Sequence, residues 1–321
     1  MIYKMGIDIG STTVKIVTLN ENDEIIYKRY ERHFSKVKEK TAELLKLAKD
    51  ILGENEAKIT MTGSAGQGVA EACGFEFVQE VFVTGEMAKK YYPETDCVIE
   101  LGGEDAKIIF LKNGLEERMN GSCAGGTGSF IDQMSLLLDV SNEELDALSL
   151  QAEKIHAIAS RCGVFAKSDI QPLLNQGAKK ENIAASIFQA VVDQTITGLA
   201  QGREISGNVL FLGGPLHFFA GLKKRFTETL RLSDNAANAA IFPDIAPYAV
   251  ALGAALSARG NAVSYSYENI MQSLEKYANA QKNIQHTAPL FENEDEYRKF
   301  RERHSANALK KANIKTYEGD A

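Results

Sequence analysis

One turn near the start of this sequence combines the residue types that bind nucleotide phosphates. Its members are small or carry hydroxyl groups: Gly10, Ser11, Thr12 and Thr13. Backbone amides and hydroxyls crowded into such a turn can surround an anion. Asp8 precedes the turn, and its carboxylate could hold Mg²⁺ through water, because Mg²⁺ prefers oxygen ligands and keeps several waters. Lys15 follows the turn and could either add positive charge to a phosphate or simply face solvent.

The same arrangement recurs 92 residues later in the chain. IDIGSTTVKIVTL at 7–19 aligns with IELGGEDAKIIFL at 99–111, and the acid, a glycine and the lysine keep their places. Because so many positions keep register, a repeat is favoured over two unrelated hairpins. The second copy adds four candidate site residues: Glu100, Gly102, Gly103 and Asp105. Two such turns that face each other can clamp one triphosphate, and we expect Asp8 and Asp105 to orient Mg²⁺ and the attacking water.

A third glycine turn follows a short apolar strand at 209–212. It consists of Gly213, Gly214 and Pro215, and a helical pattern begins after it. In open α/β sheets, ligands bind beyond the carboxyl ends of the strands, so this turn can approach the same nucleotide. Three glycine turns in duplicated order predict a nucleotide site. The chain has no GxxxxGK[ST] motif and is therefore not a P-loop protein.

The elements that position these turns follow a strand-then-helix order, twice over. Each copy of the repeat predicts a hairpin, and a third strand follows at 25–30 and at 115–119. Apolar residues at helical spacing predict helices at 35–52, 128–138, 141–152, 181–201, 216–230 and 247–259. We therefore expect two α/β lobes, at 1–94 and 95–260, with a ligand cleft between them, and a charged helical tail at 261–321.

Composition points to a cytoplasmic protein without a nucleic-acid or membrane partner. The net charge is −7, with 36 Lys and Arg against 43 Asp and Glu, and no long basic run occurs. Contacts along a nucleic-acid backbone need clustered Lys and Arg. No uninterrupted apolar run reaches about 18 residues, and the first residues lead directly into a strand pattern without the features of a signal peptide.

Two of the four cysteines lie in loops suited to metal chemistry. Cys123 lies in NGSCAGGTGSF and Cys162 in SRCGVFAKSDI, whereas Cys73 and Cys97 have surroundings typical of a core. A nearby helix N-terminus lowers a thiol pKa and favours the thiolate that metals bind. Two thiolates are too few for a four-iron cluster, but a two-fold dimer would supply the other pair. A disulfide or two unconnected thiols are the alternatives.

The motifs, taken in order, resemble those of known ATPases. IDIGSTTVK, IELGGEDAK and FLGGP resemble the phosphate-1, phosphate-2 and adenosine motifs of the superfamily that includes actin, hexokinase and the heat-shock chaperone ATPases. This resemblance implies an α/β fold of duplicated ribonuclease-H-like lobes that bind ATP or ADP between them. With the cysteine loops added, the sequence from 5 to 259 closely resembles the activators of 2-hydroxyacyl-CoA dehydratases and the related ATPase subunits of benzoyl-CoA reductase.

The family resemblance implies a redox role. In that family the two matching cysteines of each subunit hold one four-iron, four-sulfur cluster per homodimer, so Cys123 and Cys162 would be the ligands here. ATP hydrolysis would drive a low-potential electron, taken from ferredoxin or flavodoxin, to a dehydratase-like or reductase-like iron–sulfur partner. Glu100, Glu104 and Lys167 depart from the family pattern, which has Asp, Gln and an acidic residue at these places. The longer side chain of Glu100 could still reach Mg²⁺, and no departure removes a cluster ligand.

Two other functions fit the same fold. A small-molecule kinase would need a catalytic base and a substrate pocket in the first lobe, and no persuasive base occurs there. A nucleotide-dependent scaffold would need no chemistry beyond the ATP site. The tail is either a solvated helical appendage or a linker to further dehydratase-like domains of the same polypeptide, because 27–35 and 289–304 resemble segments of larger fused proteins.

Overall fold

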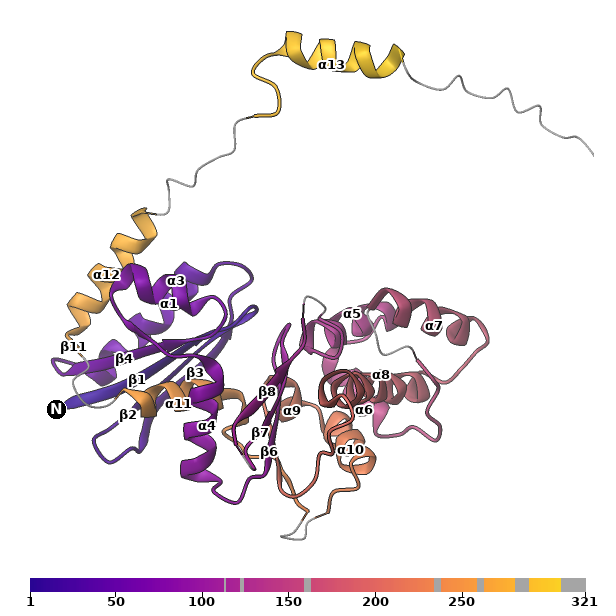
Figure 1. Cartoon of the computed structure of the whole chain (residues 1–321), viewed down its shortest axis with the longest axis horizontal. Coiled ribbons are helices and arrows are strands. Elements are labelled where there is room, and N and C mark those ends of the chain that lie inside the picture. Colours follow the sequence, from indigo (N-terminus) through magenta and orange to yellow (C-terminus); the bar gives the residue numbers. More distant parts are fainter. Residues whose placement is uncertain are drawn as a thin grey trace, which may run out of the picture. The chain divides into compact units, whose positions relative to one another are not determined.

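The computed structural model describes residues 1–112, 114–121, 124–158, 163–233, 238–258, 263–280 and 289–306. The chain divides into two units, Met1–Asn279 and Ala280–Ala321. Both copies of the repeat lie in the first unit (Figure 1).

The first sheet contains the first copy of the repeat. Its strands, in spatial order, are β11 (Ser264–Tyr265), β4 (Glu56–Thr62), β1 (Ile2–Ile9), β2 (Thr13–Leu19) and β3 (Ile25–Arg32), and β5 (Glu76–Phe77) also pairs with β4. β1 runs antiparallel to β2 and parallel to β4. Across the hairpin, Asp8 on β1 is the partner of Lys15 on β2.

The second sheet repeats this topology. Its strands, in spatial order, are β10 (Ala240–Ile241), β9 (Val209–Leu212), β6 (Cys97–Leu101), β7 (Ala106–Phe110) and β8 (Glu116–Met119). β6 runs antiparallel to β7 and parallel to β9, and Glu100 is the cross-strand partner of Lys107. The predicted duplication is thus confirmed, and its acid and lysine occupy equivalent positions in the two hairpins.

Helices α4 (Glu80–Tyr91) and α11 (Ala249–Ser257) lie between the two sheets, and α11 is preceded by the short helix η2 (Ala246–Tyr248). Their apolar side chains join residues from both sheets in one buried cluster. Glycines allow the close approach. A Cβ at Gly6 would lie 1.9 Å from the Ala251 carbonyl oxygen, and a Cβ at Gly253 would lie 1.9 Å from the Val83 carbonyl oxygen. Helix α11 therefore packs directly against the backbones of β1 and α4.

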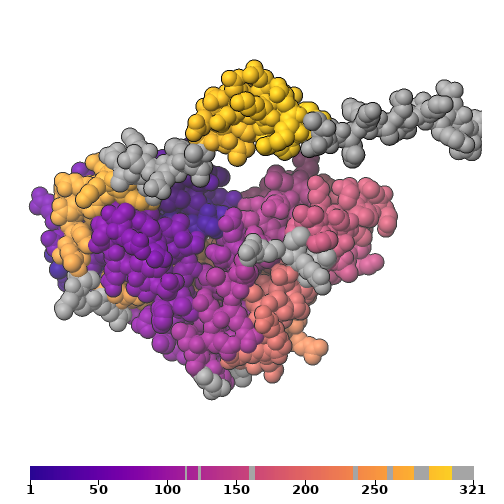
Figure 2. Space-filling view, turned by 45° about the horizontal axis from the view of Figure 1, so that its top comes forward, coloured from indigo at the N-terminus to yellow at the C-terminus, as the bar shows by residue number. Residues whose placement is uncertain are grey.

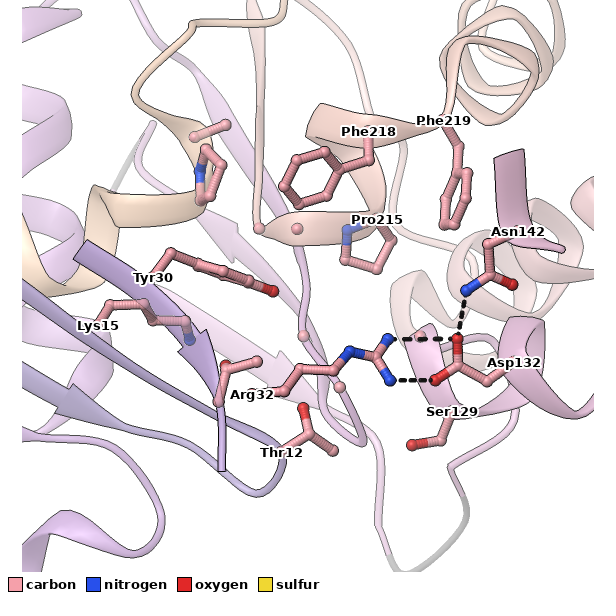
Figure 3. Close-up of a pocket in the computed structure, with 18 of the residues that line it drawn as sticks. Thr12, Lys15, Tyr30, Arg32, Ser129, Asp132, Asn142, Pro215, Phe218 and Phe219 are labelled. Carbon is pink, nitrogen blue, oxygen red and sulfur yellow. Dashed lines mark hydrogen bonds and ion pairs between the residues drawn. The ribbon is translucent and has the colours of Figure 1, made fainter. Parts of the chain in front are cut away.

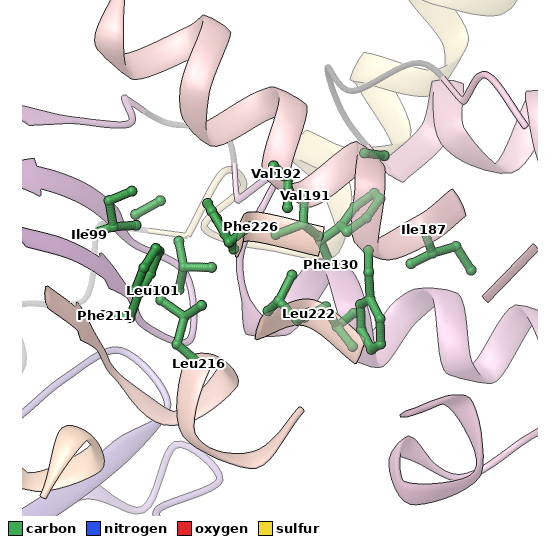
Figure 4. Packing of buried hydrophobic residues seen from close by; sticks show 14 of the residues in the cluster. Ile99, Leu101, Phe130, Ile187, Val191, Val192, Phe211, Leu216, Leu222 and Phe226 are labelled. Carbon is green, nitrogen blue, oxygen red and sulfur yellow. The ribbon is translucent and has the colours of Figure 1, made fainter. Parts of the chain in front are cut away.

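The outer face of the second sheet carries a helical layer. Its helices are α5 (Gly128–Leu138), α6 (Asn142–Ser149), α7 (Gly163–Asn175), α8 (Lys180–Thr195) with its π-helical extension η1 (Ile196–Ala200), α9 (Gly214–Phe218) and α10 (Ala220–Thr229). Phe130, Ile187 and Leu222 from this layer belong to the same buried cluster as Ile99 and Phe211 of the sheet (Figure 4). Because both faces are covered, β6 and β7 are buried along their whole length.

One segment of this layer meets the length and composition expected of a membrane span. It is Lys180–Ala200, and 67% of its most apolar window is buried inside the protein. Ile183, Ile187 and Val191 on this segment belong to the core of the second lobe. Its apolar character is therefore explained by packing within the lobe.

The first sheet is covered by α1 (Val37–Leu47), α2 (Lys49–Leu52), α3 (Gly66–Cys73) and α12 (Tyr267–Ala280). Ile270 and Leu274 of α12 are 0% and 5% exposed and share one buried cluster with Ile7 and Leu44. Part of the segment expected as a tail thus packs on the first lobe.

The second unit contains α13 (Glu294–Ala306). The ring of Phe291, which precedes this helix, contacts the rings of Tyr297 and Phe300 on it.

Candidate nucleotide site

A cavity of about 440 Å³ lies where the glycine turns of the two repeat copies meet. Its walls come from both lobes: Lys15 and Arg32 reach it from the first, and Asp132 and Phe218 from the second (Figure 3). A cavity of this size is typical of sites for drug-sized or cofactor-sized ligands.

The turn between β1 and β2 is held in shape by hydrogen bonds. The Gly10 amide donates to the Thr13 carbonyl oxygen at 3.0 Å, and the His33 amide donates to the Thr12 carbonyl oxygen at 3.1 Å. The Nδ1 atom of His33 accepts from the Ser35 amide at 3.1 Å, so the ring carries its proton on Nε2 and donates it to the Gly10 carbonyl oxygen at 3.0 Å. These contacts fix the turn whose Thr12 and Thr13 line the cavity.

The second glycine turn touches the first. The Gly102 amide donates to the Asp105 carbonyl oxygen at 2.7 Å, which closes the turn between β6 and β7. A Cβ at Gly103 would lie 2.0 Å from Thr12 Oγ1, so a larger residue there would collide with the opposite turn. The two turns therefore approach one another as the sequence predicted, and residues of both turns line one cavity.

Lys15 supplies positive charge to the cavity. Its Nζ lies 2.7 Å from Asp8 Oδ2, and Asp8 is 3% exposed. Burial alone would lower the pKa of Lys15, but the Asp8 carboxylate more than offsets this effect and the pKa is raised. Lys15 consequently stays protonated at physiological pH.

Glu100 lines the same cavity and has an unused acceptor. Its Oε2 is buried and has no hydrogen-bond partner among the described residues, while its Oε1 lies 3.7 Å from Lys107 Nζ. Burial raises the pKa of Glu100 to about 7, against the lowering effect of Lys107. A buried carboxylate oxygen without a partner, beside a phosphate-sized space, suits a hydrated cation.

The third glycine turn forms another wall of the cavity. Gly213 has a φ of +93°, and a Cβ there would lie 2.0 Å from the Leu101 carbonyl oxygen, so only glycine fits. Phe218 and Phe219 follow on this side, and Tyr30 from β3 meets Phe218 edge-on with ring centroids 6.0 Å apart. Aromatic walls of this kind suit a planar base.

Almost the whole first unit, residues 5–258, matches the sequence model of the BadF/BadG/BcrA/BcrD ATPase family. The chain belongs to this ATPase family. The match covers all three glycine turns of the cavity.

Individual relatives from the BadF/BadG/BcrA/BcrD family agree with this assignment. The chain is 32% identical over 265 residues to the 2-hydroxyisocaproyl-CoA dehydratase activator of Clostridioides difficile, covering 80% of this chain and 94% of that protein. It is 31% identical over 262 residues to the (R)-2-hydroxyglutaryl-CoA dehydratase activating ATPase of Acidaminococcus fermentans, covering 80% and 97%.

A solved structure supports the fold assignment. The activator of the 2-hydroxyisocaproyl-CoA dehydratase from Clostridium difficile with bound ADPNP matches this chain with a TM-score of 0.64 and 26% identity, over 89% of this chain and 100% of that one. The predicted fold of two actin-like α/β lobes is thereby confirmed, as is the family predicted from the motifs.

Most of the residues predicted for nucleotide binding line the cavity of this BadF/BadG/BcrA/BcrD ATPase. They are Thr12, Thr13, Lys15, Glu100, Gly102, Gly103, Gly213, Gly214 and Pro215. Gly10 and Ser11 belong to the first turn but do not line the cavity. Asp8 does not line it either, but it pairs with Lys15, which does. Asp105 lines a different cavity of about 220 Å³.

Sequence reasoning missed the side chains that β3 and α5 bring to the site. Tyr30 and Arg32 line the cavity from β3, and Asp132 lines it from α5. The spacing of Tyr30 and Arg32 shows that they share one face of a strand. Nothing in the sequence shows that this face looks toward the second lobe, because that depends on how the lobes pack.

The predicted cluster ligands, Cys123 and Cys162, lie outside the described residues. Cys73 and Cys97 are buried, as predicted. Burial raises the pKa of Cys73 to about 11 and that of Cys97 to about 12, which keeps both thiols protonated. Across the described ranges, no group of three or more His, Cys, Asp or Glu could hold a metal ion.

Proposed function

We propose that this chain is an ATP-dependent activator that delivers a low-potential electron to a dehydratase-like or benzoyl-CoA reductase-like iron–sulfur partner. The observation that carries the proposal is a direct link from the nucleotide cavity to α5. The Gly128 amide donates to the Gly102 carbonyl oxygen at 3.0 Å, and the Ser129 amide donates to the Gly103 carbonyl oxygen at 2.7 Å. In the sequence, Cys123 comes a few residues before Gly128, the first residue of α5, so a shift of the phosphate-binding turn would act on the segment that follows this cysteine.

Cys123 and Cys162 of two subunits would hold one four-iron, four-sulfur cluster, because thiolates in fours are the usual ligands of such clusters. When bound, the cluster would carry one electron at low potential, received from a donor such as ferredoxin or flavodoxin. Helix α7 begins at Gly163, directly after Cys162, and Figure 2 shows it, in rose, at the surface of the second lobe. Its Val164 and Phe165 are 74% and 59% exposed and offer an apolar surface to a second subunit.

The nucleotide role rests on the cavity described above. The amides and hydroxyls of the two turns would surround the phosphates, and Lys15 would neutralise part of their charge. Glu100 is the acid best placed to hold Mg²⁺ through water, because its Oε2 has no partner among the described residues whereas Asp8 is tied to Lys15. Phe218 and Phe219 would contact the base.

Anaerobic purification tests the redox half of this proposal, with the four cysteines as matched variants. Wild-type protein should be brown, contain iron and sulfide, and give a paramagnetic signal after reduction with dithionite. Cys123→Ala and Cys162→Ala should each lose the iron, whereas Cys73→Ala and Cys97→Ala should retain it. Colourless, iron-free wild-type protein that still hydrolyses ATP would rule out the electron-transfer function and leave an ATPase of another kind.

A further inference from the structure

An ion pair crosses the nucleotide cavity from one lobe to the other. Arg32 on β3 donates from Nη1 to Asp132 Oδ2 at 2.9 Å and from Nη2 to Asp132 Oδ1 at 3.3 Å. Figure 3 shows this two-bond contact between the strand of the first lobe and helix α5 of the second. Both residues line the cavity, together with Thr12, Gly103 and Ser129.

The two partners differ in how firmly they are held. Asn142 Nδ2 donates to Asp132 Oδ1 at 2.7 Å, and Asn142 Oδ1 in turn accepts from Ser135 Oγ at 2.6 Å. Asp132 is therefore fixed by its own lobe. The Arg32 side chain is 50% exposed, against 32% for Asp132, so the guanidinium is the freer of the two groups.

The charges of the cavity make Arg32 valuable to a phosphate ligand. Among the described residues that line the cavity, the cationic side chains are Lys15 and Arg32, and the acidic ones are Glu100, Asp132, Glu143 and Asp146. The Lys15 side chain is 15% exposed and is paired with Asp8. A triphosphate that entered this acid-rich cavity would gain most from the guanidinium, whose planar fork matches a phosphate as well as a carboxylate.

We propose that Arg32 is a nucleotide-binding residue that exchanges partners: Asp132 holds its guanidinium in the free chain, and a phosphate of the nucleoside triphosphate takes it on binding. The proposal rests on nucleotide binding in this cavity, which is part of the proposed function. The exchange would remove one tie between β3 and α5 while α5 stays bonded to the Gly102–Gly103 turn. Nucleotide binding would thereby loosen the contact of α5 with the first lobe.

Whether each of two substitutions strengthens or weakens ATP binding distinguishes this exchange of partners from an ion pair that only holds the two lobes together. Arg32→Gln should weaken ATP binding about tenfold, because a charge-assisted hydrogen bond to phosphate is lost. Asp132→Asn keeps the acceptor for Asn142 but removes the competing charge, so it should strengthen ATP binding several-fold. If the pair only ties the lobes together, both substitutions break the same tie and should shift the dissociation constant in the same direction. That same-direction shift, or no shift in either variant, would overturn the proposal.

A double variant and a control pair complete the test. In the Arg32→Gln background, Asp132→Asn should no longer strengthen ATP binding, because there is no guanidinium to release. Lys179 and Glu153 form an exposed ion pair at 2.9 Å outside the cavity, so Lys179→Gln and Glu153→Gln should leave ATP binding unchanged. Calorimetric titration of ATP and of ADP into the full chain gives all of these constants. Wild-type protein that fails to bind ATP would refute the nucleotide site itself, a result distinct from the same-direction shift.

Discussion

Two lysines at equivalent positions of the repeat have different surroundings, and this difference bears on which of two cavities could accept a phosphate. Lys15 pairs with Asp8 and lines the cavity of the glycine turns. Lys107 lies between Glu80 and Glu100 and lines the smaller cavity, whose wall also includes Asp105 and Glu117. Its charge is already balanced by carboxylates, so the smaller cavity offers a phosphate no free cation among the described residues.

Replacing Glu100 should show how much its buried negative charge lowers the free energy of unfolding. Burial raises the pKa of Glu100 to about 7, above the usual value for Glu of about 4.3, so wild-type stability falls as pH rises between these values. Glu100→Gln should therefore raise the free energy of unfolding at pH 8, on the order of 3 kcal/mol, and change it little at pH 4. Urea unfolding at both pH values measures this, with exposed Glu104→Gln as control. An equal effect of Glu100→Gln at the two pH values would contradict the assignment.

Two roles of Lys15, neutralising the buried Asp8 carboxylate and supplying a cation for the phosphate, can be separated with a double variant. Lys15→Met leaves Asp8 buried without its partner and should lower the free energy of unfolding by about 3 kcal/mol. Adding Asp8→Asn removes the buried charge and should restore most of that stability. ATP hydrolysis should stay lost in the double variant, because the cation for the phosphate is still missing. Recovery of ATP hydrolysis in the double variant would show that Lys15 serves only to neutralise Asp8.

At the scale of elements, the hairpins could be predicted from the sequence but several helix boundaries could not. The repeat specifies β1, β2, β6 and β7 because its register of acid, glycine and lysine survives. The predicted helix at 216–230 is split at Phe219, which has extended backbone with φ −99° and ψ 107°. The predicted helix at 35–52 is divided at Ala48, between α1 and α2. Apolar spacing continues through both interruptions, so periodicity alone does not reveal them.

The contacts across the cleft could not be predicted for a related reason. Thr12, Gly103 and Gly213 can be recognised by residue type, since glycine and threonine clusters are typical of phosphate turns. Arg32 and Asp132 are 100 residues apart and lie on elements with ordinary surface composition. Their meeting depends on how two lobes dock, which no local pattern encodes.

The middle layer of helices depends on two glycines that allow backbone contact. Gly6→Ala and Gly253→Ala each bring a Cβ to 1.9 Å from a carbonyl oxygen, so each should lower the free energy of unfolding by at least about 2 kcal/mol. A Cβ at Gly68 in α3 would meet open space, with no neighbouring atom within 4 Å, so Gly68→Ala should stabilise the protein by about 0.5 kcal/mol through helix propensity. Thermal melts compare the three variants. Tolerance of Gly6→Ala would mean that α11 does not pack on β1 as described.

At the scale of the whole molecule, the end of the first lobe can be located by truncation. Because Ile270 and Leu274 are buried in the first-lobe core, a chain that ends at residue 280 should keep wild-type stability and ATP hydrolysis. A chain that ends at residue 260 loses these two side chains and should be about 4 kcal/mol less stable. Chemical unfolding of the two truncated chains measures the difference. Equal stability would place α12 outside the folded lobe.

The proposed electron-transfer function would require two chains around one cluster, since each chain contributes two candidate thiolates. Native mass spectrometry of the anaerobically purified protein tests this claim most directly, because it weighs the intact assembly. The expected mass is that of two chains with four iron and four sulfide ions, and Cys123→Ala should remove the inorganic mass. A metal-free dimer, or a single chain that carries a complete cluster, would contradict the claim that the chain is a cluster-sharing activator.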